Sequence, residues 1–282
     1  MTTLQTIIIA IVEGLTEFLP VSSTGHMILA QSMIGVESTD FVKAFDVIIQ
    51  FGAILSVVVL YWNRFFRLDK SAPKPGASSI QKMLHPINFY VRLLIAFMPA
   101  AVIGLLCKSY IDMLLESVVV VATMLIVGGI FMLFVDKWFD VSPSQAKKIN
   151  NHNALIIGFF QCISMIPGVS RSMATIVGGM TQKLTRKDAA EFSFFLAVPT
   201  MFAATVFKLF QLFMKEGTAM IEEHIGILLL GNLVAFVVGL LAIKFFIAFI
   251  TKYGFKAFGW YRIIVGGLIL GLLAAGVGIE II

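Results

Sequence analysis

The sequence predicts an all-α integral membrane protein with six transmembrane helices and two re-entrant helix–loop–helix hairpins in an inverted-topology repeat. Three observations support this fold class. Hydrophobic residues make up 59% of the chain and charged residues only 13%, against about 25% in a typical soluble domain. The apolar residues gather in long blocks, as spans in lipid require. Two further apolar blocks are broken by proline and polar residues, which is typical of hairpins that enter a membrane and turn back.

Unbroken apolar blocks approach or exceed the roughly 20 residues that cross a hydrocarbon core. Helices are favoured over a barrel because the chain has no series of short alternating strands. We therefore expect residues 1–282 to form one polytopic domain. Its predicted spans are residues 44–62, 90–107, 117–136, 189–212, 226–250 and 261–280.

The two broken blocks cover residues 4–33 and 153–180. The first is interrupted at residues 20–26 by Pro-Val-Ser-Ser-Thr-Gly-His, which we call the first break. The second is interrupted at residues 167–172 by Pro-Gly-Val-Ser-Arg-Ser, which we call the second break. Irregular backbone at membrane depth is tolerated only where it is buried in protein or lines a wet cavity. Each block is therefore predicted to be a re-entrant hairpin.

The distribution of loop charges predicts the orientation, because cytoplasmic loops are enriched in lysine and arginine. The net charge of +5 is explained by these loops, so no nucleic-acid partner is expected. The first hairpin should enter from outside, the second from inside, and both termini should lie outside. Loops 62–92, 181–188 and 251–262 (the last holding Lys252, Lys256 and Arg262) are expected in the cytoplasm, and segments 107–117 and 213–225 outside.

This path has the form of an inverted repeat with halves at residues 1–138 and 150–282. Weak internal similarity agrees with it, since Pro20 precedes Pro167 by 147 positions. The tetrapeptide Ile-Val-Gly-Gly at residues 126–129 also recurs at residues 264–267. Inverted repeats with broken helices occur in many transporters, so a lipid flippase or secondary transporter is an alternative function.

Glu13 and Glu17 are the first candidate site residues. Their spacing of four places both carboxylates on one helix face. Ionised side chains at membrane depth are costly and usually mark a functional site. The alternative is that both lie near a membrane surface and are simply solvated. Carboxylate oxygens also suit Mg²⁺ or Ca²⁺, so the pair is a candidate site for a divalent cation.

The first break supplies Ser22, Ser23 and His26. Serines before a helix present hydroxyls and backbone N–H groups where a phosphate is favoured, although plain helix capping is the alternative. His26 follows Ser23 by three residues, so it is expected to reach that hydroxyl or a bound phosphate. Histidine takes up a proton near neutral pH without special tuning. We expect Ser23 as nucleophile with His26 as its base, and direct attack by His26 as the alternative.

The second break supplies Ser170, Arg171 and Ser172, followed by Thr175. A guanidinium cannot be neutralised by deprotonation, so an intramembrane arginine needs an anionic partner. A diphosphate fits its planar fork. The alternative is a structural salt bridge to Glu13 or Glu17, and both can hold when the site is empty. The expected phosphate ligands are Arg171, Ser22, Ser170, Ser172 and Thr175. The expected catalytic residues are Ser23, His26, Glu17, Glu13 and Arg171.

The two breaks together resemble a known family. Residues 12–26, Val-Glu-Gly-Leu-Thr-Glu-Phe-Leu-Pro-Val-Ser-Ser-Thr-Gly-His, closely resemble the first signature of undecaprenyl-diphosphate phosphatases, also called bacitracin-resistance proteins. Residues 167–172 resemble the second signature, and the segments Glu-Phe-Ser-Phe at 191–194 and Ala-Val-Pro at 197–199 also look like this family. The similarity extends essentially end to end. Met173 departs from the small residue of many members, which puts the pocket shape in doubt but removes no reactive group.

The resemblance implies an enzyme that hydrolyses undecaprenyl diphosphate to undecaprenyl phosphate and inorganic phosphate. This reaction recycles the lipid carrier for cell-wall synthesis and confers bacitracin resistance. The resemblance also implies a multi-pass protein of the bacterial inner (cytoplasmic) membrane, an active site opening to the outer face, a homodimer and a dependence on a divalent cation, Mg or Ca. Prenyl chain length, the identity of the metal and the role of the dimer stay open at this point.

Overall fold

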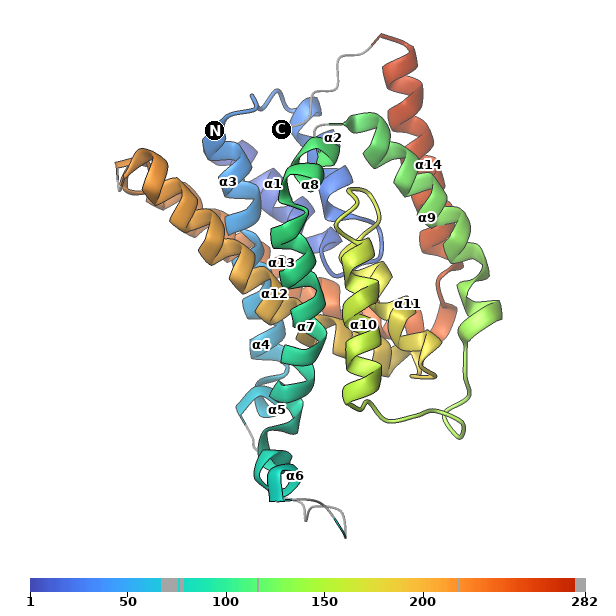
Figure 1. Cartoon of the computed structure of the whole chain (residues 1–282). Helices are drawn as coiled ribbons and strands as arrows, with labels where there is room; N and C mark the ends of the chain where they lie inside the picture. Colours follow the sequence, from blue (N-terminus) through green and yellow to red (C-terminus); the bar gives the residue numbers. More distant parts are fainter. Residues whose placement is uncertain (67–75, 77–78, 116, 218, 277–282) are drawn as a thin grey trace.

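The computed structural model describes residues 1–66, 76, 79–115, 117–217 and 219–276, and regular structure in these ranges is entirely helical (Figure 1). The all-α prediction is therefore confirmed for the described residues. The first half contains α1 (Thr3–Thr16), α2 (Ser23–Met33), α3 (Asp40–Ile48), α4 (Gln50–Leu60), α5 (Trp62–Phe66), α6 (Ser79–Leu84), the 3-10 helix η1 (His85–Ile87), α7 (Asn88–Leu106), α8 (Lys108–Leu115) and α9 (Val118–Phe139). The second half contains α10 (Asn151–Ile163), α11 (Arg171–Thr181), α12 (Arg186–Glu216), α13 (Ala219–Tyr253) and α14 (Lys256–Ala274).

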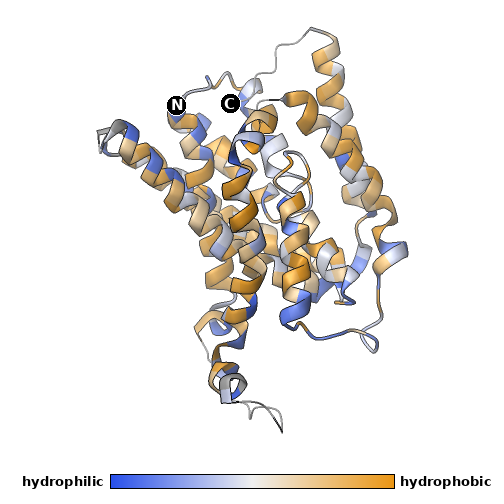
Figure 2. Ribbon diagram, viewed as in Figure 1, coloured by the Kyte–Doolittle hydropathy of each residue, from blue (hydrophilic) through white to orange (hydrophobic). Residues whose placement is uncertain are grey.

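Six helical segments are long and apolar enough to cross a membrane, as the sequence predicts. Figure 2 shows them as mostly hydrophobic ribbons whose polar residues gather toward their ends. The segments are Asp40–Leu60, Lys82–Leu106, Val118–Phe139, Arg186–Lys215, Glu222–Tyr253 and Lys256–Ala274. The end of the last predicted span, from residue 277, and the predicted loop charges Arg67, Asp69, Lys70 and Lys74 lie outside the described residues.

Four shorter helices flank the two breaks. α1 packs against α2, and α10 packs against α11, so each broken block folds as a helix–loop–helix hairpin. In both hairpins the second helix follows a serine with positive φ, Ser22 at 70° and Ser170 at 78°. Residues other than glycine rarely adopt positive φ. The two breaks therefore share one uncommon backbone conformation at matching positions, a kind of strain that gathers at functional sites.

The halves interlock. α1 packs against α13 of the second half, while α10 packs against α7 of the first half. α9 and α14 lie side by side along their length (Figure 1). Their close approach depends on small residues, since a Cβ atom added to Gly129 would lie 2.7 Å from the carbonyl oxygen of Gly259. A Cβ added to Gly266 would meet the oxygen of Ala122 at 2.7 Å. The recurring Ile-Val-Gly-Gly segments thus bring α9 and α14 together.

The placement of Arg262 in a cytoplasmic loop is wrong. α13 continues to Tyr253 and α14 begins at Lys256, so Arg262 lies within a helix. Its side chain is fully buried. A count of loop charges cannot recognise this case, because the partners of Arg262 are backbone carbonyls far away in the chain. Lys252 and Lys256 are exposed near the helix ends, as expected for the loop.

Candidate functional site

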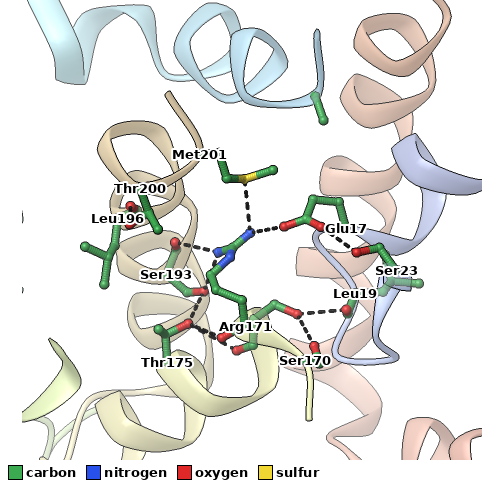
Figure 3. Close-up of polar contacts among 12 residues, drawn as sticks. Glu17, Leu19, Ser23, Ser170, Arg171, Thr175, Ser193, Leu196, Thr200 and Met201 are labelled. Atoms are coloured by element: carbon green, nitrogen blue, oxygen red, sulfur yellow. Dashed lines mark hydrogen bonds and ion pairs between the residues drawn. The ribbon is translucent and has the colours of Figure 1, made fainter. Parts of the chain in front are cut away.

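The two hairpins meet through direct side-chain contacts. Nη2 of Arg171 lies 2.9 Å from Oε1 of Glu17 (Figure 3). The hydroxyl of Ser172 donates a hydrogen bond of 2.8 Å to the carbonyl oxygen of Leu19. Both contacts join segments about 150 positions apart in the chain. The structure therefore brings the charged and hydroxyl groups of both breaks into one site.

Arg171 is held from one side by α12. Its Nη1 donates to the carbonyl oxygen of Ser193 at 3.0 Å and to the Ser193 hydroxyl at 3.3 Å. Thr175 completes this support, because its hydroxyl lies 2.6 Å from Oγ of Ser193 and donates to the Arg171 carbonyl at 2.8 Å. Nε of Arg171 is buried without a hydrogen-bond partner among the described residues. One donor of the guanidinium is therefore left for a ligand.

Glu17 joins the hydroxyl of the first break to the arginine of the second. Its Oε2 accepts a hydrogen bond of 2.7 Å from Oγ of Ser23, and Oε1 takes the ion pair with Arg171. This contact confirms the salt bridge that the sequence offers as one role of Arg171. A carboxylate is also a proton acceptor, so the Ser23 hydroxyl already points at a group able to take its proton. The arrangement is a hydroxyl, a base and a cation in line.

Glu13 lies next to this line and is fully buried. Neither carboxyl oxygen of Glu13 has a hydrogen-bond partner among the described residues. Burial of an unpaired polar group is costly, so such a group requires an explanation in function. Of the two predicted acids, Glu13 is therefore the one whose carboxylate oxygens accept no hydrogen bond from a described residue.

The ring nitrogens of His26 contact Ser22 and Tyr261 and not Ser23. Its Nδ1 lies 2.8 Å from the carbonyl oxygen of Ser22, and its Nε2 lies 2.8 Å from the hydroxyl of Tyr261. The His26 and Tyr261 rings are stacked at 7° with centroids 5.4 Å apart. The structure brings Ser23 to Glu17 and not to His26, and the catalytic role of His26 stays a prediction.

The other serines of the breaks differ in their surroundings. Ser170 caps α11, since its hydroxyl accepts from the backbone N–H of Met173 at 3.3 Å, and it lies 3.0 Å from Oγ of Ser172. Ser22 stands at the matching position before α2 but provides no side-chain cap. The first N–H groups of α2, beginning at Ser23, are thus without that cap. Uncapped N–H groups at a helix N-terminus favour a phosphate oxygen.

Arg262 is the principal site-supporting residue that the sequence analysis misses. Its guanidinium donates to five backbone carbonyls and to no carboxylate among the described residues. One acceptor, Pro20, belongs to the first break at 3.0 Å. Gly168 at 2.8 Å and Val169 at 3.0 Å belong to the second break. The remaining acceptors, Met124 and Leu125, lie on α9. Arg262 therefore ties both breaks to α9.

A signal for Arg262 exists in the sequence. The residue is followed directly by the apolar run at residues 263–265. An arginine next to apolar residues needs partners, and this holds for Arg262 as it does for Arg171. Ser193 is a second missed residue, and its signal is a lone hydroxyl between Phe192 and Phe194 within a predicted span.

A divalent cation is the cofactor that the family resemblance implies, and its fit can be examined. No group of three or more His, Cys, Asp or Glu side chains within the described ranges could hold a metal ion. Glu17 already engages Arg171 and Ser23. Glu13, whose two buried oxygens lack a geometric hydrogen-bond partner in the described part and lie within electrostatic range of Glu17 and Arg171, is the available ligand. Magnesium is commonly bound by one or two carboxylates together with substrate phosphates. The residues fit a cation that arrives with a phosphate ligand.

Comparisons with known proteins identify the family of the chain. The family model described as "Bacitracin resistance protein BacA" matches residues 6–268. The chain is 56% identical over 282 residues to an undecaprenyl-diphosphatase of Porphyromonas gingivalis W83, covering 100% of both chains. It is 55% identical over 273 residues to an undecaprenyl-diphosphatase of Flavobacterium johnsoniae, covering 96% of each chain. A third, from Bdellovibrio bacteriovorus, is 48% identical over 285 residues and covers 100% of each chain.

Proposed function

Because the chain belongs to the bacitracin resistance protein BacA family, we propose that it hydrolyses undecaprenyl diphosphate to undecaprenyl phosphate and inorganic phosphate. Full-length relatives named undecaprenyl-diphosphatase support this activity. The single observation that carries it is the line formed by Ser23, Glu17 and Arg171, with contacts of 2.7 and 2.9 Å. The reaction returns a lipid carrier to cell-wall synthesis, which accounts for bacitracin resistance.

Arg171 is the group that recognises the diphosphate. Its guanidinium offers Nε and shares Nη2 with Glu17. A diphosphate carries more negative charge than one carboxylate, so it competes with Glu17 for the arginine fork. Loss of its cationic partner makes Glu17 a stronger proton acceptor. Substrate binding thereby prepares Glu17 to take the proton of Ser23.

Ser23 is the proposed nucleophile. Its Oγ attacks the terminal phosphorus while its proton passes to Glu17, and the anhydride P–O bond breaks so that undecaprenyl phosphate leaves. Water then hydrolyses the phosphoserine, releasing inorganic phosphate and the free hydroxyl. Most of the rate enhancement comes from positioning and charge neutralisation by Arg171 and the N–H groups that open α2. Direct attack by His26 is less favoured, because both ring nitrogens have other partners.

A divalent cation is proposed as the cofactor, bound by Glu13 together with phosphate oxygens of the substrate. When bound, it would neutralise charge on the diphosphate. Glu17 is a weaker candidate ligand because Ser23 and Arg171 occupy its two oxygens. Two of the predicted phosphate ligands, Thr175 and Ser172, are fully buried. The Thr175 hydroxyl donates to the Arg171 carbonyl, and the Ser172 hydroxyl donates to the Leu19 carbonyl. Ser22 and Ser170 are proposed to contribute through the backbone at the two breaks.

We also propose that residues 1–138 and 150–282 form an inverted repeat and that the helix–loop–helix hairpin in each half is re-entrant. Support comes from the reciprocal packing of α1 on α13 and of α10 on α7, together with the matching serines of positive φ. A location in the bacterial inner membrane and a site open to the outer face are proposed from the family resemblance, and the positive loops support a cytoplasmic position for those loops. A homodimer is proposed from the family resemblance.

Phosphate release from undecaprenyl diphosphate by the purified chain in detergent tests the function. We expect turnover by the unchanged protein and a loss of at least about 1000-fold in kcat/KM for Arg171→Ala. Lys252→Ala is the control, since Lys252 is an exposed cation outside the site. A transporter or flippase needs no nucleophile, so absence of phosphate release from the folded protein would favour that alternative.

A further inference from the structure

A second hollow of the molecule lies away from the two breaks, at the ends of α4 and α7 and the start of α12. Its cavity volume is about 530 Å³. Four cationic side chains line it, against the two carboxylates of Asp188 and Glu191. We call this hollow the basic pocket. Its cations are Arg64, Arg92, Lys147 and Lys148.

Both carboxylates of the basic pocket have partners outside its cation set. Oδ2 of Asp188 accepts from the Thr185 hydroxyl at 2.7 Å, at the N-terminus of α12. Oε1 of Glu191 lies 4.0 Å from Nζ of Lys187, and the same carboxylate also interacts electrostatically with Arg64 of the pocket. The positive charge of the pocket is therefore only partly offset from within.

Two further acids near the pocket are paired with an arginine that is not among its cations. Asp136 and Asp140 pair with Arg186 at 2.9 and 2.7 Å. Within the part of the chain that the structure describes, Arg64 and the two lysines at 147–148 make no ion pair. Such a pocket is electrostatically suited to an anion.

An aromatic wall forms the apolar side of the basic pocket. Tyr61 and Phe195 meet edge to face with centroids 5.0 Å apart, and Phe89 meets Phe195 at 5.2 Å. The Arg64 guanidinium lies 4.9 Å above the Phe89 ring, which holds the cation over this wall. A ligand that fits both features carries an anionic group and an apolar chain.

The level of the basic pocket in the bilayer is marked by exposed aromatic side chains. Trp62 is 55% exposed and Tyr90 39%, and each directly follows a pocket residue in the chain. Phe66, two positions after Arg64, is 59% exposed. Trp and Tyr gather at membrane–water interfaces. The apolar segment Asp40–Leu60 ends immediately before Tyr61. The basic pocket thus lies where lipid headgroups meet hydrocarbon.

A backbone hydrogen bond fixes the segment after α9, which forms one side of the basic pocket. The N–H of Lys147 donates to the carbonyl oxygen of Lys183 at 2.9 Å. This bond joins the segment before α10 to the turn before α12. The lysines of this segment are therefore held at the pocket without a ligand.

We propose that the basic pocket binds the headgroup phosphate of an anionic bilayer phospholipid, with the acyl chains against the aromatic wall. Basic pockets between membrane helices are suited to such headgroups. A bilayer lipid is favoured over free phosphate because half of the twelve residues that line the pocket are apolar or aromatic, four of them aromatic. This site is separate from the two breaks, and its occupancy does not depend on hydrolysis.

The test is native mass spectrometry of the delipidated full-length protein in detergent, titrated with phosphatidylglycerol. The paired variant Lys147→Gln, Lys148→Gln should bind about 10- to 30-fold more weakly than the unchanged protein. The matched control is Lys252→Gln, Lys256→Gln, which removes two exposed lysines outside the pocket and should change binding less than twofold. Size-exclusion profiles check that both variants are folded.

Three outcomes would overturn the proposal. Equal weakening by the two paired variants would indicate general charge attraction. Equal affinity for phosphatidylcholine would remove the requirement for an anionic headgroup. Displacement of phosphatidylglycerol by inorganic phosphate at the same concentration would assign the pocket to the free ion. Retained selectivity for phosphatidylglycerol, lost only with Lys147 and Lys148, supports the site.

Discussion

Nη2 of Arg171 lies 2.9 Å from Oε1 of Glu17, although 154 positions separate the two residues. The same carboxylate accepts a hydrogen bond from Ser23. A cation that binds phosphate and a hydroxyl that can attack phosphorus are therefore connected through one acid. Because substrate phosphate and Glu17 compete for the same guanidinium, recognition and activation are coupled in this site.

The fork geometry of Arg171 should matter beyond its charge. Arg171→Lys keeps a cation but cannot reach Ser193, Glu17 and a phosphate together, because an ammonium lacks the planar fork. We expect kcat/KM for lipid-diphosphate hydrolysis to fall by about 100-fold, less than for Arg171→Ala. Steady-state phosphate release measures both variants. Full activity of Arg171→Lys would show that charge alone is sufficient.

Ser23 and Glu17 should act as one unit. Ser23→Ala and Glu17→Gln are each expected to lower kcat by about 1000-fold or more, and the double variant should lose little beyond either single change. A double-mutant cycle on phosphate release measures this coupling. Additive losses would place the two residues in independent roles. Near-normal turnover by Ser23→Ala would leave His26 as the nucleophile.

Glu13 should set the dependence on a divalent cation. Glu13→Gln removes the charge of a buried carboxylate that has no partner among the described residues while keeping its size. We expect the Mg²⁺ concentration for half-maximal phosphate release to rise by about tenfold or more. An unchanged Mg²⁺ titration together with lower kcat would separate Glu13 from the cation.

Arg262 should be required for the folded state. Arg262→Met leaves five backbone carbonyls without their donor, and each buried unsatisfied group costs about 1–3 kcal/mol. We expect a loss of several kcal/mol, on the order of 3 or more, and a lower thermal midpoint in detergent. Arg262→Lys restores fewer donors, so its thermal midpoint should lie between those of Arg262→Met and the unchanged protein. An unchanged midpoint for Arg262→Met would refute the tie between the breaks.

Gly128 should be required for the position of the Arg262 side chain. A Cβ atom added to Gly128 would lie 2.4 Å from Nη2 of Arg262, so Gly128→Ala must displace the guanidinium. We expect a lower thermal midpoint and lower hydrolytic activity together. Gly267→Ala is the control, because its added Cβ meets no atom within 4 Å. Equal effects of the two changes would reflect helix packing in general.

The spans and the breaks could be predicted from the sequence because hydropathy and interruption by proline are local signals. The Glu17–Arg171 pair was one of two named possibilities, since an embedded arginine requires an anion but either acid satisfies the charge argument. Spacing along the helix could not separate them. The choice depends on where Thr16 ends α1 and where Ser193 holds the guanidinium.

Two features depended on tertiary structure: the orientation of the His26 ring and the identity of the partners of Arg262. A spacing of three places His26 near Ser23 on an ideal helix, but the imidazole contacts the Ser22 carbonyl and the Tyr261 hydroxyl instead. The backbone partners of Arg262 come from three distant segments, and no local pattern records a carbonyl as a ligand. Loop-charge counting therefore assigned Arg262 to the wrong environment.

The most direct test of the central claim is inorganic phosphate release from undecaprenyl diphosphate by purified Ser23→Ala protein, beside the unchanged protein and a Ser32→Ala control. The proposed mechanism predicts that Ser23→Ala loses activity by about 1000-fold or more while Ser32→Ala retains it. Undiminished phosphate release by folded Ser23→Ala would contradict a serine hydroxyl activated by Glu17 under the control of Arg171.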